Sequence, residues 1–170
     1  MIDNTNLNKN AVAEIWRLLE EVCDPEVPVL SILDLGIVRE VNAIEDEVEI
    51  IITPTYSGCP AMDAIHTDIR LKLIEHGYKN VKIKTVLSPA WTTDWMSEAG
   101  KQKLKAFGIA PPNPIQIVCD TKLFAASEAI PCPLCNSYHT KVISQFGSTA
   151  CKALYQCQDC KEPFDYFKCH

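Results

Sequence analysis

The sequence lacks three features that each mark a broad class of protein. It has no basic excess, because 16 lysine and arginine residues stand against 22 aspartate and glutamate residues, and the net charge of −6 disfavours nucleic-acid binding. It has no apolar run near the roughly 20 residues that span a bilayer. Its first ten residues lack the basic-then-apolar layout of a signal peptide. We therefore expect a cytoplasmic protein with no membrane partner.

Cysteine, by contrast, is abundant. The chain has nine cysteines, and two Cys-x-x-Cys pairs, Cys132 with Cys135 and Cys157 with Cys160, stand near its end. In a reducing compartment such pairs favour metal ligation over disulfides. Four thiolates complete a structural zinc site and leave no open position for catalysis. The sequence predicts zinc at these cysteines, and iron in a rubredoxin-like site is the alternative that it leaves open.

The apolar pattern before these cysteines predicts an α+β fold, a small sheet with helices on one face. The predicted helices cover residues 10–23, 60–76 and 97–106, and the predicted strands cover residues 37–43, 47–53, 81–87 and 115–119. The stretch 107–114 is expected to be a hinge, because it is rich in proline. The expected division is an α+β domain over residues 10–112, a connecting segment over 113–130 and a four-cysteine ribbon over 131–170.

Cys59 stands between a predicted strand and a predicted helix. Because Pro60 suits the first helical position, we expect Cys59 at the N-cap, where the helix dipole favours a thiolate and lowers its pKa. Such a thiolate is a nucleophile or a metal ligand, and an ordinary cap is the simpler alternative. Asp24 and Glu26 lie in a loop that we hypothesise to face Cys59 and assist metal binding, although turn chemistry also explains them.

Cys151 and Cys169 offer a second possible thiol pair in the ribbon. At about 3.3 Å per strand residue, Cys151 lies roughly 20 Å from Cys157, too far to bind the same ion. If the chain returns antiparallel, Cys151 comes opposite or nearly opposite Cys169, and we hypothesise that the pair binds metal or joins in a cluster. The alternative is two unremarkable cysteines, since free cysteine often behaves as a small buried apolar residue.

Three segments, residues 24–38, 53–63 and 88–112, resemble the SufT-like iron–sulfur assembly family. The ribbon, with FGSTACKALYQC and EPFDYFKC, resembles that of the family's phenylacetate-degradation branch. The resemblance covers nearly the whole chain beyond its first ten residues. It implies a protein that helps assemble or deliver iron–sulfur clusters, with Cys59 in that role.

The resemblance also implies partners, namely the subunits of a phenylacetyl-CoA epoxidase complex or its reductase. The implied function is an accessory metallocentre-assembly factor, not an enzyme, that matures or maintains the iron–sulfur or di-iron centre of that complex. Since one cysteine cannot complete a four-ligand cluster, a homodimer that shares the cluster is a further expectation. A non-catalytic scaffold subunit is the alternative. A thiol enzyme is weakly supported, because no histidine base for Cys59 is evident.

Overall fold

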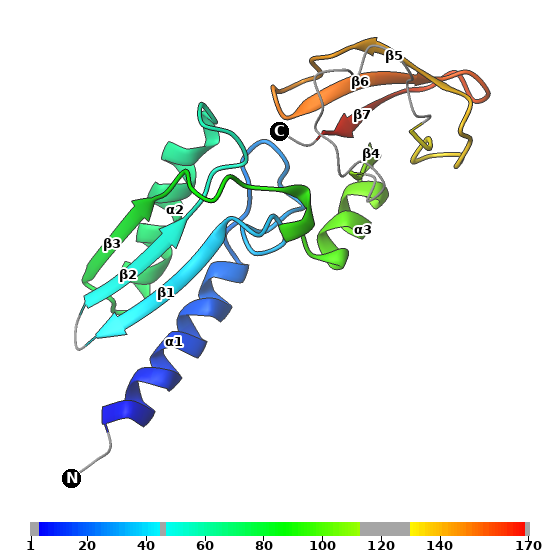
Figure 1. The fold of residues 1–170 in the computed structure, drawn as a ribbon. Coiled ribbons are helices and arrows are strands. Elements are labelled where there is room, and N and C mark those ends of the chain that lie inside the picture. The colour runs from blue at the N-terminus through cyan, green and yellow to red at the C-terminus, as the bar shows by residue number, and fades with distance from the viewer. Residues whose placement is uncertain (1–3, 45–46, 113–129, 169–170) are drawn as a thin grey trace. The chain divides into compact units, whose positions relative to one another are not determined.

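The computed structural model describes residues 4–44, 47–112 and 130–168 (Figure 1). The chain divides into two compact units, Met1–Trp91 and Thr92–His170, which we call the N-terminal and C-terminal units. Among the residues described, none of the helices combines the length and the apolar character that crossing a membrane requires.

The N-terminal unit is a three-stranded sheet with two helices. Its elements in chain order are α1 (Asn4–Glu20), β1 (Val38–Ile44), β2 (Glu47–Ile52), α2 (Ala61–Glu75) and β3 (Asn80–Thr85). The strand order is β1-β2-β3, in which β1 and β2 are antiparallel while β2 and β3 are parallel. Helix α2 is therefore the crossover that a parallel pair requires.

One face of this sheet is buried under the helices and the other carries charge. Val48, Ile50 and Ile52 of β2 are buried and alternate with more exposed residues, which is the pattern of a strand with one covered face. On the opposite face, Lys82 and Lys84 of β3 form ion pairs with glutamates of β2. The buried residues of the helices face the covered side: Ile15, Leu18 and Leu19 of α1, and Ala61, Ile65, Ile69 and Leu73 of α2.

Helix α2 ends where the sequence predicts a stop. Gly77 has a φ of 93°, a left-handed conformation that costs glycine little. The N–H groups of Gly77 and Tyr78 donate to the carbonyl oxygens of Ile74 and Leu73, at 3.0 Å each, and so satisfy the end of the helix. The start of α2 differs from the prediction by one residue, which matters for Cys59 below.

In its described residues, the C-terminal unit has a four-stranded sheet and one α-helix. Its elements are the 3₁₀ helix η1 (Thr93–Trp95), α3 (Glu98–Ala106), β4 (Ile109–Ala110), β5 (Thr140–Ser144), β6 (Lys152–Cys157) and β7 (Pro163–Phe167). The strand order is β4-β7-β6-β5. Strands β6 and β7 are antiparallel, as the sequence predicts for the ribbon. Ser97 caps α3, because its hydroxyl accepts the N–H of Gly100 at 2.8 Å.

The α+β fold with a C-terminal ribbon is confirmed, but several boundaries differ from the sequence-based expectation, among them those of α1, which spans Asn4–Glu20 and not residues 10–23. The hinge expected over residues 107–114 is wrong at Ile109 and Ala110, which form β4 and pair in parallel with β7. Residues from Thr92 onward therefore belong to the same compact unit as the ribbon, whereas the α+β domain is expected to extend to residue 112. The extents of the three predicted parts stay predictions. The strand predicted over residues 115–119 lies outside the described residues.

Candidate metal centres

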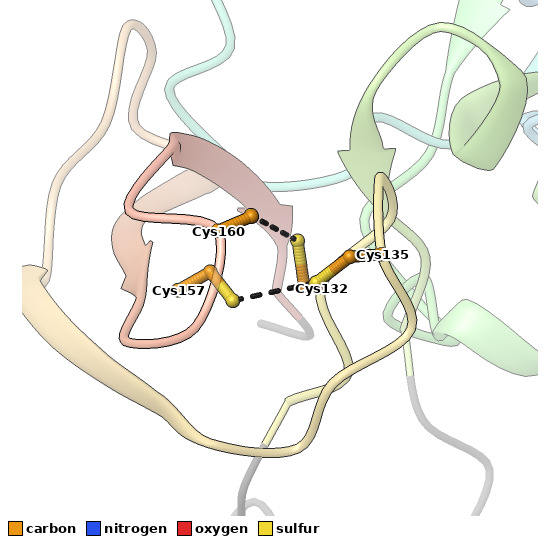
Figure 2. Close-up of side chains that lie close together, drawn as sticks. All are labelled: Cys132, Cys135, Cys157 and Cys160. Carbon is orange, nitrogen blue, oxygen red and sulfur yellow. Dashed lines mark hydrogen bonds between the residues drawn. The ribbon is translucent and has the colours of Figure 1, made fainter.

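The four cysteines of the ribbon converge in one cluster. Their Sγ atoms all lie within 4.8 Å of one another, with 3.8 Å between Cys132 and Cys160 and 3.5 Å between Cys135 and Cys157 (Figure 2). A tetrahedral zinc ion with Zn–S bonds of about 2.3 Å needs sulfurs about 3.8 Å apart. The cluster therefore has the donor set and nearly the spacing of a closed four-thiolate site.

Backbone N–H groups converge on these sulfurs. The N–H of Ser137 donates to Cys135, the N–H of Glu162 donates to Cys160, and Cys157 accepts from the N–H groups of Asp159 and Cys160. Because a thiolate accepts hydrogen bonds more strongly than a thiol does, these donors favour the charged sulfurs that a metal requires.

A left-handed residue follows each Cys-x-x-Cys turn. Asn136, after Cys135, has a φ of 61°, and Lys161, after Cys160, has a φ of 68°. In the first turn this geometry lets the N–H of Asn136 donate to the carbonyl of Cys132 at 2.9 Å. The sequence predicts this conformation at Asn136, since asparagine tolerates it. It gives no such signal at Lys161, because lysine is uncommon there.

The thiols of the cluster oppose one another's ionisation. Burial raises the pKa of Cys157, but the backbone N–H groups of Cys160 and Asp159, together with the thiols of Cys135 and Cys160, lower that pKa to about 6. The backbone N–H of Glu162 favours ionisation of Cys160, yet burial and the neighbouring thiols raise the pKa of Cys160 to about 12. One sulfur is thus charged at the expense of another. A divalent cation removes this conflict, so the residues fit zinc.

The cluster is also part of the apolar core of its unit. Cys132 and Cys157 are fully buried, while Cys135 and Cys160 lie at the surface. The residues buried together around the two inner cysteines are Ala110, Ile130, Ala153, Phe164 and Tyr166. Ligation at this place joins β6 to the turn before β5 and thereby closes the core.

Cys59 lies in the loop between β2 and α2, but it is not the cap of the helix. The structure places Pro60 at the N-cap and starts α2 at Ala61, so the N-cap position expected for Cys59 is wrong by one residue. Cys59 sits in a turn, where its N–H donates to the carbonyl of Tyr56 at 3.2 Å. Its sulfur accepts hydrogen bonds from the N–H of Ala61 and the side chain of Thr55.

The expectation that the helix lowers the pKa of Cys59 is also wrong. Burial of the half-buried thiol raises its pKa, and this effect outweighs the hydrogen bond from the N–H of Ala61. The negative charges of Glu26 and Asp24 raise the pKa further. The free thiol is therefore protonated at neutral pH, and Cys59 is not a preformed thiolate nucleophile.

The same charges make Asp24 and Glu26 part of the electrostatic environment of Cys59. Asp24 is 8% exposed, and its Oδ1 accepts the N–H groups of Glu26 and Val27 at 2.7 and 2.9 Å. Turn chemistry therefore explains Asp24 locally, while its charge still reaches Cys59. Metal binding by the two carboxylates stays a prediction. The contribution of Thr55 was not predicted, because a threonine four residues before a cysteine carries no distinctive signal.

Replacing Glu26 with glutamine tests the electrostatics around Cys59. Removal of this charge should lower the pKa of Cys59, and the alkylation of Cys59 by iodoacetamide at neutral pH should become roughly two- to fivefold faster. The measurement is the alkylation rate as a function of pH, with the exposed Glu20→Gln as a control that should leave the curve unchanged. An unchanged curve for Glu26→Gln would show that its charge does not act on Cys59.

The second thiol pair stays a prediction, because Cys169 lies outside the described residues. Cys151 is buried, its Sγ lies 3.0 Å from the hydroxyl of Thr149, and its carbonyl accepts the N–H of Lys168 at 3.1 Å. The strand register thus places Lys168 opposite Cys151. Of the cysteines without an expected role, Cys23 is exposed and Cys119 lies outside the described residues.

Both parts of the chain match known protein families. Residues 12–84 match the family described as iron–sulfur cluster assembly protein, and residues 118–168 match the PaaD zinc beta ribbon domain. Over 158 residues the chain is 49% identical to an Escherichia coli (strain K12) protein that is named as a putative subunit of 1,2-phenylacetyl-CoA epoxidase, and the match covers 93% of each chain. The chain belongs to the PaaD family. The family resemblance expected from the sequence is thereby confirmed.

Two further relatives match little more than half of this PaaD-family chain. It is 40% identical over 93 residues to the "Fe-S protein maturation auxiliary factor" of Porphyromonas gingivalis (strain ATCC BAA-308 / W83), which covers 54% of this chain and 88% of the relative. A crystal structure of a DUF59 domain of unknown function from Bacillus anthracis superposes with a TM-score of 0.56 at 28% identity. That match covers 59% of this chain and 96% of the other. The PaaD-family chain thus joins an iron–sulfur assembly domain to a zinc-ribbon domain.

Proposed function

We propose that this protein is an accessory factor that matures or maintains a metal centre of a phenylacetyl-CoA epoxidase, with Cys59 holding iron or an iron–sulfur cluster as transient cargo. Two names support the proposal: the Escherichia coli relative is named as a subunit of that epoxidase, and the Porphyromonas gingivalis relative as a maturation factor for Fe-S proteins. The partners proposed are the subunits of the epoxidase or its reductase.

The observation that carries the proposal is the set of groups around Cys59. The thiol is half-buried, two hydrogen-bond donors reach its sulfur, and two carboxylates lie close enough to raise its pKa. Those carboxylates oppose a bare thiolate, but they attract a cation. Arrival of iron therefore reverses the electrostatics: the proton leaves Cys59, and Asp24 and Glu26 then stabilise the bound charge.

The incomplete ligand set suits a carrier rather than a permanent site. One thiolate with carboxylates leaves an iron–sulfur cluster short of the four cysteines that usually hold it. The missing ligands would come from a second copy of the chain or from the recipient protein. Exchange of these outer ligands would let the cargo move to the recipient without unfolding the carrier.

Zinc has a different part in the proposal. Cys132, Cys135, Cys157 and Cys160 supply all the ligands of a closed site, so the ion would stabilise the ribbon and take no part in transfer. The support is the mutual spacing of the four sulfurs and the conflict among their charges, both described above. The ribbon would then present a stable surface to the epoxidase.

Complementation separates cargo delivery from a scaffold role. In cells that lack this protein, we expect the wild-type chain to restore phenylacetyl-CoA epoxidase activity and the Cys59→Ala chain to leave it at the level of the empty vector. The exposed Cys23→Ala is the matched control and should restore activity fully. Full activity with Cys59→Ala would contradict cargo delivery and favour a scaffold subunit.

A further inference from the structure

Three polar side chains outside the four-cysteine cluster connect its two turns. Asp159 lies within the second turn, between Cys157 and Cys160, whereas Ser137 and His139 follow the first turn. The hydroxyl of Ser137 donates to Oδ2 of Asp159, and Nδ1 of His139 lies 3.0 Å from Oδ1 of Asp159. Both oxygens of one carboxylate are therefore used to bridge the turns.

Backbone hydrogen bonds hold the same residues in register. The N–H of His139 donates to the hydroxyl of Ser137 at 3.0 Å, and the N–H of Gln158 donates to the carbonyl of His139 at 2.7 Å. The N–H of Cys132 donates to the carbonyl of Ser137 at 2.9 Å. The segment that carries Ser137 and His139 is thus hydrogen-bonded through its backbone to both turns.

Two of the bridging residues also reach the sulfurs. The N–H of Ser137 donates to Cys135, and the N–H of Asp159 donates to Cys157, so that the Ser137–Asp159 contact joins donors on different turns. We propose that Ser137, Asp159 and His139 form a clasp that keeps the two turns together and slows the loss of metal from the cluster. This inference rests on the proposed zinc site.

Because the clasp is exposed, it should affect the release of metal more than the global stability of the protein. The side chains of His139 and Asp159 are 72% and 57% exposed, and exposed ion pairs contribute little to global stability. Loss of the ion to a chelator, however, requires the sulfurs to leave the metal, and this is easier when the two turns can move apart. Groups that orient metal ligands commonly change metal affinity by about 10- to 100-fold, so the clasp should act on metal release far more than on folding.

The test is the rate of zinc transfer from the full-length, zinc-loaded protein to excess 4-(2-pyridylazo)resorcinol at neutral pH. We expect release from Asp159→Asn to be about tenfold faster than from wild type. The control is Glu162→Gln, which removes the same charge from an exposed side chain beside the second turn. It keeps the backbone N–H of residue 162 that donates to Cys160, so it should release zinc at the wild-type rate. Ser137→Ala should also release zinc faster, and the Ser137→Ala, Asp159→Asn double variant should be no faster than Asp159→Asn.

The possible results separate the clasp from the zinc site. Wild-type release rates from zinc-loaded Asp159→Asn and Ser137→Ala would overturn the clasp and leave the zinc site intact. Equal acceleration in Asp159→Asn and Glu162→Gln would also overturn it, because charge alone would then explain the effect. A wild-type protein that binds no zinc would overturn the zinc site and the clasp together.

Discussion

Cys157→Ala is expected to abolish zinc binding and to unfold the ribbon, while the N-terminal unit stays folded. Cys157 is fully buried and belongs both to the four-cysteine cluster and to the core around it. Structural zinc supplies about 10–16 kcal/mol of apparent folding free energy in small modules, more than the core of so short a segment can replace. The measurement is zinc content together with amide hydrogen exchange, in which β6 and β7 should lose their protection.

Cys151→Ala is the matched control for that experiment. Cys151 directly precedes the same strand and is also buried, yet it lies outside the cluster. Its replacement should remove a small amount of packing and leave both the zinc of the four-cysteine cluster and the protection of β6 unchanged. Native protection and bound zinc in Cys157→Ala would contradict the structural role of the cluster.

Cys59→Ala is expected to remove iron binding without disturbing zinc. The charges of Asp24 and Glu26 act on the thiol of Cys59, so Cys59→Ala removes the thiolate that is proposed to bind iron beside them. After anaerobic reconstitution with iron and sulfide, the wild-type protein should show the visible absorption of a cluster and the variant should not. Cys23→Ala should behave as wild type, since the thiol of Cys23 is exposed and has no proposed part in iron binding. Equal absorption in Cys59→Ala would place the cluster on other residues.

The sequence predicts the elements that carry strong local signals. The hairpin of β1 and β2, helix α2 with its stop at Gly77, and helix α3 after Ser97 all lie within a few residues of their expected places. The four ribbon cysteines also converge as predicted, because each Cys-x-x-Cys turn brings two sulfurs together and two such pairs at this separation are typical of a zinc site.

Elements that depend on distant partners could not be predicted. Strand β4 has only two residues and exists through its pairing with β7, more than fifty residues later. Strand β5 exposes both Val142 and Ile143, so it lacks the alternation that reveals a half-buried strand. The clasp is equally hidden, because the contact of Ser137 with Asp159 depends on how the two turns meet.

The pKa of Cys59 shows how a small shift in geometry reverses a site prediction. Spacing places the thiol near the start of a helix, which favours the thiolate. The fold instead gives the cap to Pro60, partly buries the thiol, and brings Glu26 and Asp24 from more than thirty residues upstream. Burial and these charges are tertiary effects, so the direction of the pKa shift of Cys59 could not be predicted from the local sequence.

The central claim is that Cys59 carries iron separately from the zinc of the ribbon. The most direct test is to count zinc, iron and acid-labile sulfide per chain in wild-type and Cys59→Ala proteins purified without oxygen. We predict equal zinc in the two proteins, and iron with sulfide in the wild type alone. Iron and sulfide in equal amounts in both proteins, or in neither, would contradict the claim.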